Sequence, residues 1–304
     1  MAKIIVTHKS PDLDAVTSVW LLKKFIPSLQ TAKVAYVLAG KKLEGIYKNE
    51  GEVIEMLNTD EVIHVDTGMG KLDHHQFQDE TICAASLVKN YVLDHPDTTL
   101  HNPHTIKALD SLIDLVIDED HFQQVFHADS ASFIREFTLI GIFDGMKLQN
   151  KGDDEILIKG CELLDALLVS FESRVAAEEE LKDGIEFETR WGKAIALETV
   201  NDTVMKLAQI KGYSVVIRRD PASSLMRIKA WPRMRSDKKA EYTTVKERDI
   251  DLTPIYTIVK EKDMYASWFL HASKRMLLNG SSKNPDSIPT KLTLNEIIEI
   301  LKSV

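Results

Sequence analysis

The stretch "IIVTHKSPDLDAVTSVW" (residues 4–20) joins a buried-looking strand to an amphipathic helix through a polar segment. Its apolar run predicts a short strand over residues 3–7, and the spacing of the later apolar residues predicts a helix over residues 14–26. A chain reversal needs only one or two polar residues, so the excess of ionisable side chains between the two elements indicates a functional site. These side chains are His8, Asp12 and Asp14.

The same alternation of strand and helix patterns continues along the first half of the chain. Further strands are predicted at 33–40, 61–68 and 136–147, and helices at about 50–57, 81–93 and 104–117. Strands that alternate with helices are typical of an α/β fold built on a parallel sheet. The sequence therefore predicts a mainly parallel sheet with helices on both faces.

A long helical pattern divides the chain. Asp153 or Asp154 can begin this helix, which continues without a break to about Asp183, where Gly184 can end it. Strands are predicted beyond it at 192–199, 213–220 and 225–233, followed by an amphipathic helix at the end of the chain. We expect a first domain over residues 1–150, a connecting helix over 151–184 and a smaller α+β domain over 185–304.

Charge is distributed unevenly. The net charge is −9, which argues against a protein that coats duplex DNA. Residues 214–248, however, carry ten Lys or Arg and four Asp or Glu, so this window is +6 and the remainder of the chain is −15. The basic window is either an ordinary solvated hairpin or a surface that holds an anionic substrate.

The sequence gives no sign of a membrane span or of disulfide bonds. No apolar run reaches the 18 or so residues that a membrane helix needs. Cys83 and Cys161 are far apart and form no CxxC motif, so we expect reduced thiols in a cytoplasmic protein.

Acidic residues and histidines follow several of the predicted strands. Asp66 ends the run "VIHVD". The segment "LDHHQ", which contains Asp73, His74 and His75, follows this run closely. Asp144 ends the run at 136–147. Ligands bind at the carboxyl ends of strands in open α/β sheets, so these side chains are expected to converge with those of the first polar segment. Asp114 and Asp118 are alternatives to Asp144, but their flanking residues favour a helix.

This mixture of residues suits a pair of divalent metal ions. Carboxylate oxygen and imidazole nitrogen together suit Mn²⁺, Zn²⁺ or Fe²⁺ better than an all-oxygen Mg²⁺ site. We expect Mn²⁺, with Mg²⁺, Zn²⁺ or Fe²⁺ as alternatives. Asp12 and Asp14 are two residues apart, so one carboxylate can serve each metal of a pair. The alternative is that both aspartates simply cap a helix, since Asp is a favoured N-cap residue.

The chain resembles the DHH phosphoesterase superfamily in four features, which occur in this order: the block "HKSPDLDA", an Asp that ends a strand, the block "DHH" and a later Asp that ends a strand. Its members include RecJ-like nucleases, oligoribonucleases, cyclic-dinucleotide phosphodiesterases and family II inorganic pyrophosphatases. "LDHHQ", "FDGMK" and "SWFLHASKRMLLNGSS" (267–282) are most similar to the melanocyte-proliferating-gene-type hydrolases, a family described as metal-dependent and exonuclease-like.

The resemblance assigns roles to residues by position. It implies one metal held by His8, Asp12 and Asp66, and a second held by Asp14, Asp66, His74 and Asp144, with Asp66 bridging. It implies that Asp73 orients the neighbouring imidazole and that His75 contacts the scissile phosphate and protonates the leaving group. His271 in "FLHAS" resembles a substrate contact from the second domain. The first domain would then be the metal-binding catalytic domain.

Together these features predict a metal-dependent phosphoesterase that acts on a small nucleotide or the end of a short single-stranded oligonucleotide by two-metal activation of water. The substrate-binding residues would be His75, His271, Arg218, Arg219, Lys229, Arg233 and Arg235. Two alternatives stay open: hydrolysis of pyrophosphate or another phosphoanhydride, and a nucleotide-sensing protein without turnover. The sequence also leaves a homo-oligomer open.

Overall fold

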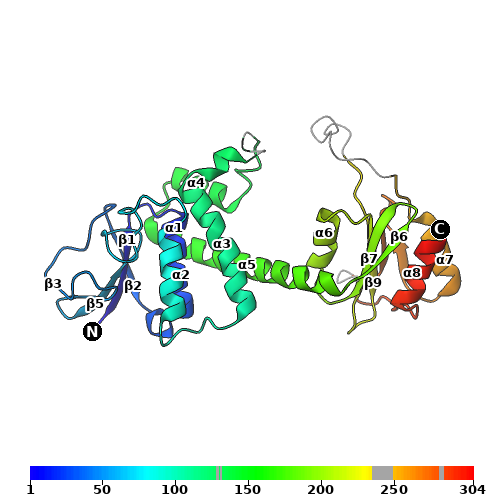
Figure 1. The fold of residues 1–304 in the computed structure, drawn as a ribbon, viewed down its shortest axis with the longest axis horizontal. Coiled ribbons are helices and arrows are strands. Elements are labelled where there is room, and N and C mark those ends of the chain that lie inside the picture. The colour runs from blue at the N-terminus through cyan, green and yellow to red at the C-terminus, as the bar shows by residue number, and fades with distance from the viewer. Residues whose placement is uncertain (128–129, 131, 235–248, 281–283) are drawn as a thin grey trace. The chain divides into compact units, whose positions relative to one another are not determined.

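The computed structural model describes residues 1–304 except 128–129, 131, 235–248 and 281–283. The chain divides into two compact units, Met1–Glu172 and Ser173–Val304, and each contains its own mixed β-sheet (Figure 1). The division falls within the long helix α5 (Asp153–Glu180). The helix predicted at 153–183 is thus confirmed, with a short 3-10 turn, η3 (Leu181–Asp183), after it.

The first unit is built on a five-stranded sheet of order β2-β1-β5-β4-β3. Its strands are β1 (Lys3–His8), β2 (Lys33–Val37), β3 (Tyr47–Lys48), β4 (Glu55–Leu57) and β5 (Asp60–His64). Both β2 and β5 pair with β1 in parallel, as the sequence predicts. The carboxyl ends of β1 and β5 therefore lie side by side, which brings the segments after these strands together.

The remaining two strands of this sheet correct a prediction. The helix expected at about 50–57 is wrong: β4 pairs antiparallel with β5, and β3 pairs antiparallel with β4. Asn49 and Gly51 adopt positive φ angles of 55° and 88° between β3 and β4. Such left-handed residues form turns and are incompatible with a continuous helix, so the sheet is mixed and only partly parallel.

Among the described residues of the first unit, six helical segments precede α5. They are α1 (Leu13–Phe25), η1 (Pro27–Leu29), α2 (Ala84–Asp94), α3 (Pro103–Asp120), η2 (Gln123–Phe126) and α4 (Leu139–Leu148). Figure 1 shows α1, α2 and α3 on one side of the sheet. Helix α1 is buried along almost its whole circumference, with Val16, Val19 and Leu22 fully inaccessible, because it packs on β1, α2 and α3 together.

The apolar run at 136–147 forms a helix and not the predicted strand. Thr138 caps α4 by accepting a hydrogen bond from the backbone N–H of Gly141. Phe143 and Met146, three residues apart, are buried, whereas Asp144 between them is exposed. Periodicity alone does not separate a short apolar strand from a buried helix, which explains the wrong prediction.

The second unit contains a six-stranded sheet of order β10-β11-β9-β8-β7-β6. Its elements are β6 (Ile185–Thr189), β7 (Gly192–Glu198), α6 (Thr203–Ile210), β8 (Val215–Arg219), β9 (Met226–Ala230), α7 (Thr253–Lys262), β10 (Trp268–Leu270), β11 (Met276–Asn279) and α8 (Leu294–Ser303). The three predicted strands and the final helix are confirmed. Among the strands that the structure describes, only β7 and β8 pair in parallel, so this sheet is also mixed.

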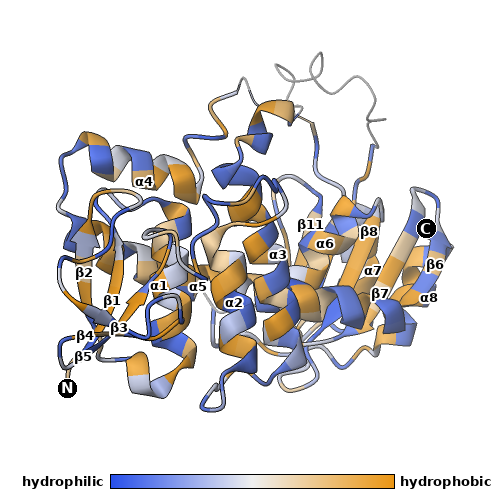
Figure 2. Ribbon diagram, turned by 60° about the vertical axis from the view of Figure 1, so that its left-hand side comes forward, coloured by the Kyte–Doolittle hydropathy of each residue, from blue (hydrophilic) through white to orange (hydrophobic). Residues whose placement is uncertain are grey.

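The hydrophobic residues of the second unit are concentrated between its sheet and its helices (Figure 2). Helix α8 begins with a reciprocal capping pair, Thr293 and Glu296, and packs its buried face, including Ile297 and Leu301, into this core. Within the described ranges, no helix is both long and apolar enough to cross a membrane. Both cysteines, Cys83 and Cys161, are free thiols.

Candidate metal centre

The end of β1 and the segment after β5 form a first group of candidate ligands. Nε2 of His8, the last residue of β1, lies 3.1 Å from Oδ2 of Asp66 and 3.5 Å from Oδ2 of Asp12. Nδ1 of His8 lies 2.9 Å from the carbonyl oxygen of Lys9. A carbonyl only accepts, so Nδ1 carries a proton, and Nε2, which faces the two carboxylates, could bind a cation after giving up its own proton.

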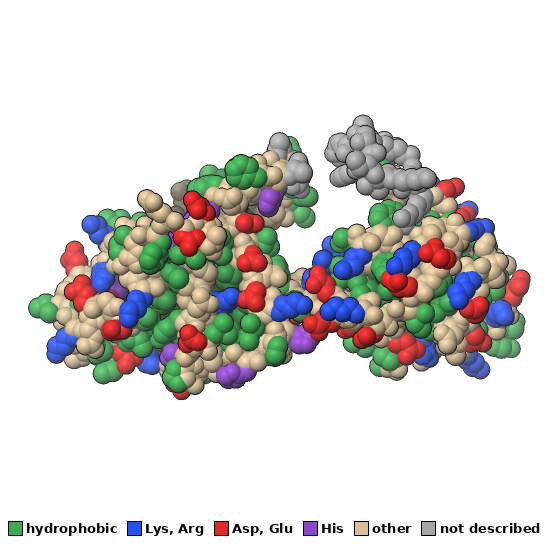
Figure 3. Space-filling model, in the orientation of Figure 1, with side chains coloured by type: hydrophobic (Ala, Val, Ile, Leu, Met, Phe, Trp, Pro, Cys, Tyr) green, Lys and Arg blue, Asp and Glu red, His purple; other side chains and the backbone are tan. Residues whose placement is uncertain are grey.

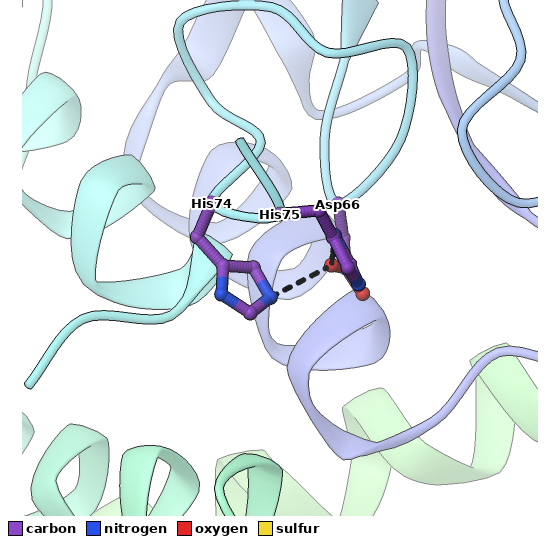
Figure 4. Close-up of side chains that lie close together, drawn as sticks. All are labelled: Asp66, His74 and His75. Carbon is purple, nitrogen blue, oxygen red and sulfur yellow. Dashed lines mark ion pairs between the residues drawn. The ribbon is translucent and has the colours of Figure 1, made fainter. Parts of the chain in front are cut away.

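A second group surrounds the Nε2 atom of His74. This nitrogen lies 3.4 Å from Oδ2 of Asp120, 3.6 Å from Oδ1 of Asp66 and 3.7 Å from Oδ2 of Asp14. Figure 4 shows His74 and Asp66 facing each other, with His75 beside them. Asp66 thus presents Oδ2 to the first group and Oδ1 to the second, as a carboxylate that bridges two ions would.

The polar atoms of these groups fit metal ions. Within the described part of the chain, Nε2 of His74 and Oδ1 of Asp66 are buried and have no hydrogen-bond partner. Buried polar atoms without partners are costly and call for an explanation such as an ion. Ligand atoms that each bind one ion at about 2.1 Å lie roughly 3–4 Å from one another. Among the described residues, the sets whose ligand atoms all lie within 4.8 Å of one another are His8/Asp12/Asp66, Asp66/His74/His75 and His74/Asp120/His121. Asp14 is in none of these sets, although its Oδ2 lies 3.7 Å from Nε2 of His74.

Asp12 and Asp14 also act as helix caps, the alternative that the sequence left open. Asp12 caps α1 through Oδ1, which accepts a hydrogen bond from the N–H of Ala15, while its Oδ2 faces His8. Asp14 is buried, and its two oxygens accept hydrogen bonds from the N–H groups of Ala84 and Ala85, each at 2.7 Å. Each of these two aspartates is therefore both a helix cap and a candidate metal ligand. Asp12 has a different oxygen available for each role, and Asp14 has further lone pairs on the oxygens that accept the hydrogen bonds.

Negative charge accumulates in this centre. Burial raises the pKa of Asp66 to about 6, and burial also raises the pKa of Asp120. The pKa of Asp14 lies well above its usual value because the group is buried and because Asp66 and Asp120 are close. Burial would lower the pKa of His8, but the contacts with Asp12 and Asp66 outweigh it and raise the value to about 11. A divalent cation would remove this mutual repulsion.

Asp73 orients His75. The carboxylate of Asp73 is fully buried, and its Oδ1 lies 2.8 Å from Nδ1 of His75 and accepts a hydrogen bond from the backbone N–H of the same residue. Its Oδ2 accepts a 2.7 Å hydrogen bond from the N–H of Met69, which fixes the turn before the histidines. The side chain of His75 is 56% exposed, so a substrate can reach it.

Asp66 itself has an unusual backbone conformation. Its φ angle of 53° lies in the left-handed region, which few residues other than Gly adopt and which Asp tolerates better than most. Its N–H donates to the carbonyl of Leu72, so the loop folds back toward the Asp73–His74–His75 segment. Such backbone strain is concentrated at functional sites.

A buried charged network lies behind this loop. Glu55 on β4 accepts a 2.8 Å hydrogen bond from Nζ of Lys42 and lies 3.2 Å from Nδ1 of His64 on β5. The side chains of Lys42 and His64 approach Gly68, where an added Cβ would lie 3.1 Å from Lys42. Thr67, the residue after Asp66, donates to the carbonyl of Lys41. The network therefore fixes the segment that carries Asp66.

The structure does not bring Asp144 into either group. The residue is exposed on α4, and the acid that faces His74 is Asp120, the last residue of α3. The sequence analysis missed Asp120, although "LVIDEDH" (115–121) offered a signal in its run of acids followed by His121. The ring of His121 packs edge-on against that of His74 at 5.8 Å, and its Nε2 lies 2.8 Å from the carbonyl of Ile82.

Two of the expected substrate-binding arginines are occupied by partners in the second unit. Arg218 is buried, donates to the carbonyl of Val200 and lies within 3.6 Å of the carboxylates of Asp202 and Asp220. Arg219 forms a 2.7 Å ion pair with Glu198. Figure 3 shows acidic and basic side chains interspersed on the visible face of this unit, which agrees with an ordinary solvated surface as well as with a binding role.

The other expected contacts of the second unit lie on or after its strands. Lys229 is on β9, Arg233 follows it and is 69% exposed, and Arg235 lies outside the described residues. His271 follows β10, and its Nδ1 accepts a hydrogen bond from the N–H of Ser273. The neutral ring of His271 therefore carries its proton on Nε2.

Comparisons with known proteins give only weak likenesses. No protein-family model and no curated protein matches the chain. Among solved structures, an uncharacterized protein from Helicobacter pylori is 11% identical, with 100% of this chain and 98% of that chain covered, at a TM-score of 0.26. The DHH domain of a member of a family of ribosomal proteins is 12% identical, with 99% and 86% covered, at a TM-score of 0.27.

A third solved structure, from Methanococcus jannaschii, is assigned provisionally as a family II inorganic pyrophosphatase. It is 12% identical, with 98% of this chain and 99% of that chain covered, at a TM-score of 0.22. Overlaps this low carry no argument about fold or activity, so the function has to be inferred from the site itself.

The ligand set can be tested by metal binding. We expect Mn²⁺ at a hundred times its Kd to stabilise the wild type by about 2.7 kcal/mol, a rise in Tm of roughly 5–10 °C by thermal denaturation. Asp120→Asn should lose at least half of this rise, because the carboxylate faces His74. Asp144→Asn is the matched control and should keep it. A loss in Asp144→Asn and not in Asp120→Asn would contradict the assignment.

The buried network can be tested in the same way. Glu55→Gln removes the charge that pairs with Lys42 and faces His64, so we expect Mn²⁺ affinity measured by calorimetry to fall about tenfold. Glu52→Gln, which removes an exposed charge paired with Lys71, should leave the affinity unchanged. Equal affinities in all three proteins would show that the network does not position Asp66.

Proposed function

We propose that this chain is a metal-dependent phosphoesterase that cleaves a phosphodiester in a small nucleotide or at the end of a short oligonucleotide. The observation that carries the proposal is Asp66, whose two oxygens face two separate groups of candidate ligands. The first group is His8, Asp12 and Asp66, and the second is Asp14, Asp66, His74 and Asp120. Two divalent ions in these positions would lower the pKa of a water molecule and neutralise the charge of a phosphoryl group.

The donor set favours particular ions. Each candidate set combines carboxylate oxygen with one or two imidazole nitrogens, a combination suited to Mn²⁺, Zn²⁺ or Fe²⁺ more than to Mg²⁺. Burial lowers the pKa of His74, so its ring is neutral at physiological pH and its nitrogen is available as a ligand without loss of a proton. We propose Mn²⁺ as the working ion.

His75 is proposed as the general acid. Burial tends to lower its pKa, but the hydrogen bond with Asp73 and the charges of Asp66 and Asp120 outweigh this effect, and the pKa is raised. The protonated form of the ring is therefore favoured more than in a free imidazole. Since Asp73 holds Nδ1, the proton on Nε2 is the one that can pass to the leaving oxygen of a phosphodiester.

Phe122 favours a nucleotide over inorganic pyrophosphate as the substrate. It directly follows His121, its side chain is 70% exposed, and its φ angle of 56° is exceptional for a bulky residue. Its Cα lies two residues from that of Asp120, or about 7 Å at most, and we propose that its ring reaches a substrate bound at the candidate metal centre. Aromatic side chains in nucleic-acid-binding sites stack on nucleobases, which pyrophosphate lacks.

The second unit is proposed to contribute His271. The proton on its Nε2 can be donated to a phosphate oxygen of the bound substrate. Arg233 and Lys229 are proposed to contribute positive charge, whereas Arg218 and Arg219 would first have to leave the carboxylates that hold them.

Turnover tests the proposed function most simply. We expect the wild type with Mn²⁺ to hydrolyse a dinucleotide, and His74→Ala to lose at least a thousandfold in kcat, because the nitrogen that faces three carboxylates is gone. His104→Ala, in the first turn of α3, is the control and should retain activity. Release of phosphate from pyrophosphate without cleavage of the dinucleotide, or no turnover of either, would contradict the proposal.

The role of Phe122 gives a separate prediction. Phe122→Ala should raise KM for the dinucleotide about tenfold with little change in kcat, since stacking is worth roughly 1–3 kcal/mol per base. Phe137→Ala removes another ring, 93% exposed and distant in the chain, and should leave KM unchanged. An unchanged KM in Phe122→Ala would remove the argument for a nucleobase.

A further inference from the structure

The peptide group that joins Lys9 to Ser10 lies between two candidate ligands, His8 and Asp12, and side chains hold both of its polar atoms. Its carbonyl oxygen, on Lys9, lies 2.9 Å from Nδ1 of His8 and accepts a hydrogen bond from it. Its N–H, on Ser10, donates a 2.9 Å hydrogen bond to Oδ1 of Asp153. Asp153 is 143 residues further along the chain, so the second contact depends on the tertiary fold and not on the local sequence.

Ser10 adopts a backbone conformation that needs such support. Its φ angle of 54° lies in the left-handed region, which is unfavourable for most residues other than Gly. The preceding N–H, that of Lys9, donates a 2.7 Å hydrogen bond to the carbonyl of Val37 on β2. The segment is therefore anchored to β2 on one side and to α5 on the other. A rotation of the peptide group would break the contact with His8 and the contact with Asp153 together.

Asp153 is itself held in place, because it is the first residue of α5 and α5 packs closely on α1. Gly160 of α5 is buried, and an added Cβ there would lie 2.7 Å from Cγ1 of Val16 on α1. Further along α5, Asp165 accepts a 3.0 Å hydrogen bond from Nε1 of Trp20 on α1. Two contacts thus anchor α5 to α1, and they fix the oxygen that Asp153 presents to the peptide.

We propose that Asp153 is a positioning residue of the candidate metal centre. It holds the Lys9–Ser10 peptide, and the carbonyl of that peptide holds the ring of His8. Nε2 of the ring then faces the carboxylates of Asp12 and Asp66. A carboxylate on the N–H also polarises the peptide group, which makes its carbonyl a stronger acceptor for Nδ1.

Partners behind a ligating imidazole fix the direction of the ring, and their loss commonly weakens metal binding by roughly 10–100-fold. The effect of Asp153 on metal binding rests on the proposed function. The hydrogen bonds themselves do not, and they can be measured in the metal-free protein.

Three variants separate the acceptor from its charge. Asp153→Ala removes the acceptor and should raise the Kd for Mn²⁺, measured by calorimetry, about tenfold. Asp153→Asn removes the charge but keeps an amide oxygen that can accept, so it should bind Mn²⁺ nearly as well as the wild type. Asp154→Ala is the matched control: it removes the same charge from the same turn of α5, but its partner is the hydroxyl of Tyr36. It should bind Mn²⁺ normally.

Hydrogen exchange in the metal-free protein separates positioning from a general loss of stability. By NMR, the Nδ1 proton of His8 and the amide proton of Ser10 should exchange roughly tenfold faster in Asp153→Ala than in the wild type. Both protons should keep the wild-type rates in Asp153→Asn, and the amide protons of β1 should keep theirs in all variants.

Several results would overturn the role of Asp153. One is a wild type and Asp153→Ala that share the same Kd for Mn²⁺ or the same exchange rates. Another is a Kd that rises as much in Asp153→Asn or Asp154→Ala as in Asp153→Ala, because loss of charge alone would then explain the effect. A wild type that binds no Mn²⁺ would instead overturn the proposed metal centre, and the exchange rates would then judge the hydrogen bonds of Asp153 alone.

Discussion

The organisation of the first unit depends on the carboxylate of Asp66, which faces His8 through one oxygen and His74 through the other. Buried carboxylates repel one another, and burial alone raises the pKa of Asp66. Such an arrangement is unfavourable unless a cation occupies it. The parallel strands β1 and β5, the left-handed turn at Asp66 and the buried Glu55 network all act to hold this one group in place.

The same side chains join the site to the stability of the fold. Asp14 caps α2 and faces His74, and Asp12 caps α1 and faces His8. A residue that satisfies helix N–H groups cannot move without loosening the helix, so these candidate ligands are held in place by the fold itself. Asp153 adds a further connection from α5, because it holds the peptide whose carbonyl accepts a hydrogen bond from His8.

Local patterns predicted the part of the fold and site that depends on neighbouring residues. These local patterns predicted the strand, polar segment and helix at residues 3–25 and the parallel pairing of β1 with β5. They also predicted that His8, Asp12 and Asp66 lie close together. Asp144 was misplaced because an apolar run of about ten residues suits a strand or a buried helix equally well. Asp120 was missed because its position depends on how α3 packs, which no local pattern records. The pairing of Arg218 with acids was likewise a tertiary property.

The central claim is that Asp66 bridges two ions, and anomalous X-ray diffraction from crystals soaked in Mn²⁺ tests it most directly. The account predicts two anomalous peaks in the first unit, both within bonding distance of Asp66, one beside His8 and the other beside His74. A single peak that Asp66 does not contact, or manganese bound only elsewhere in the chain, would contradict it.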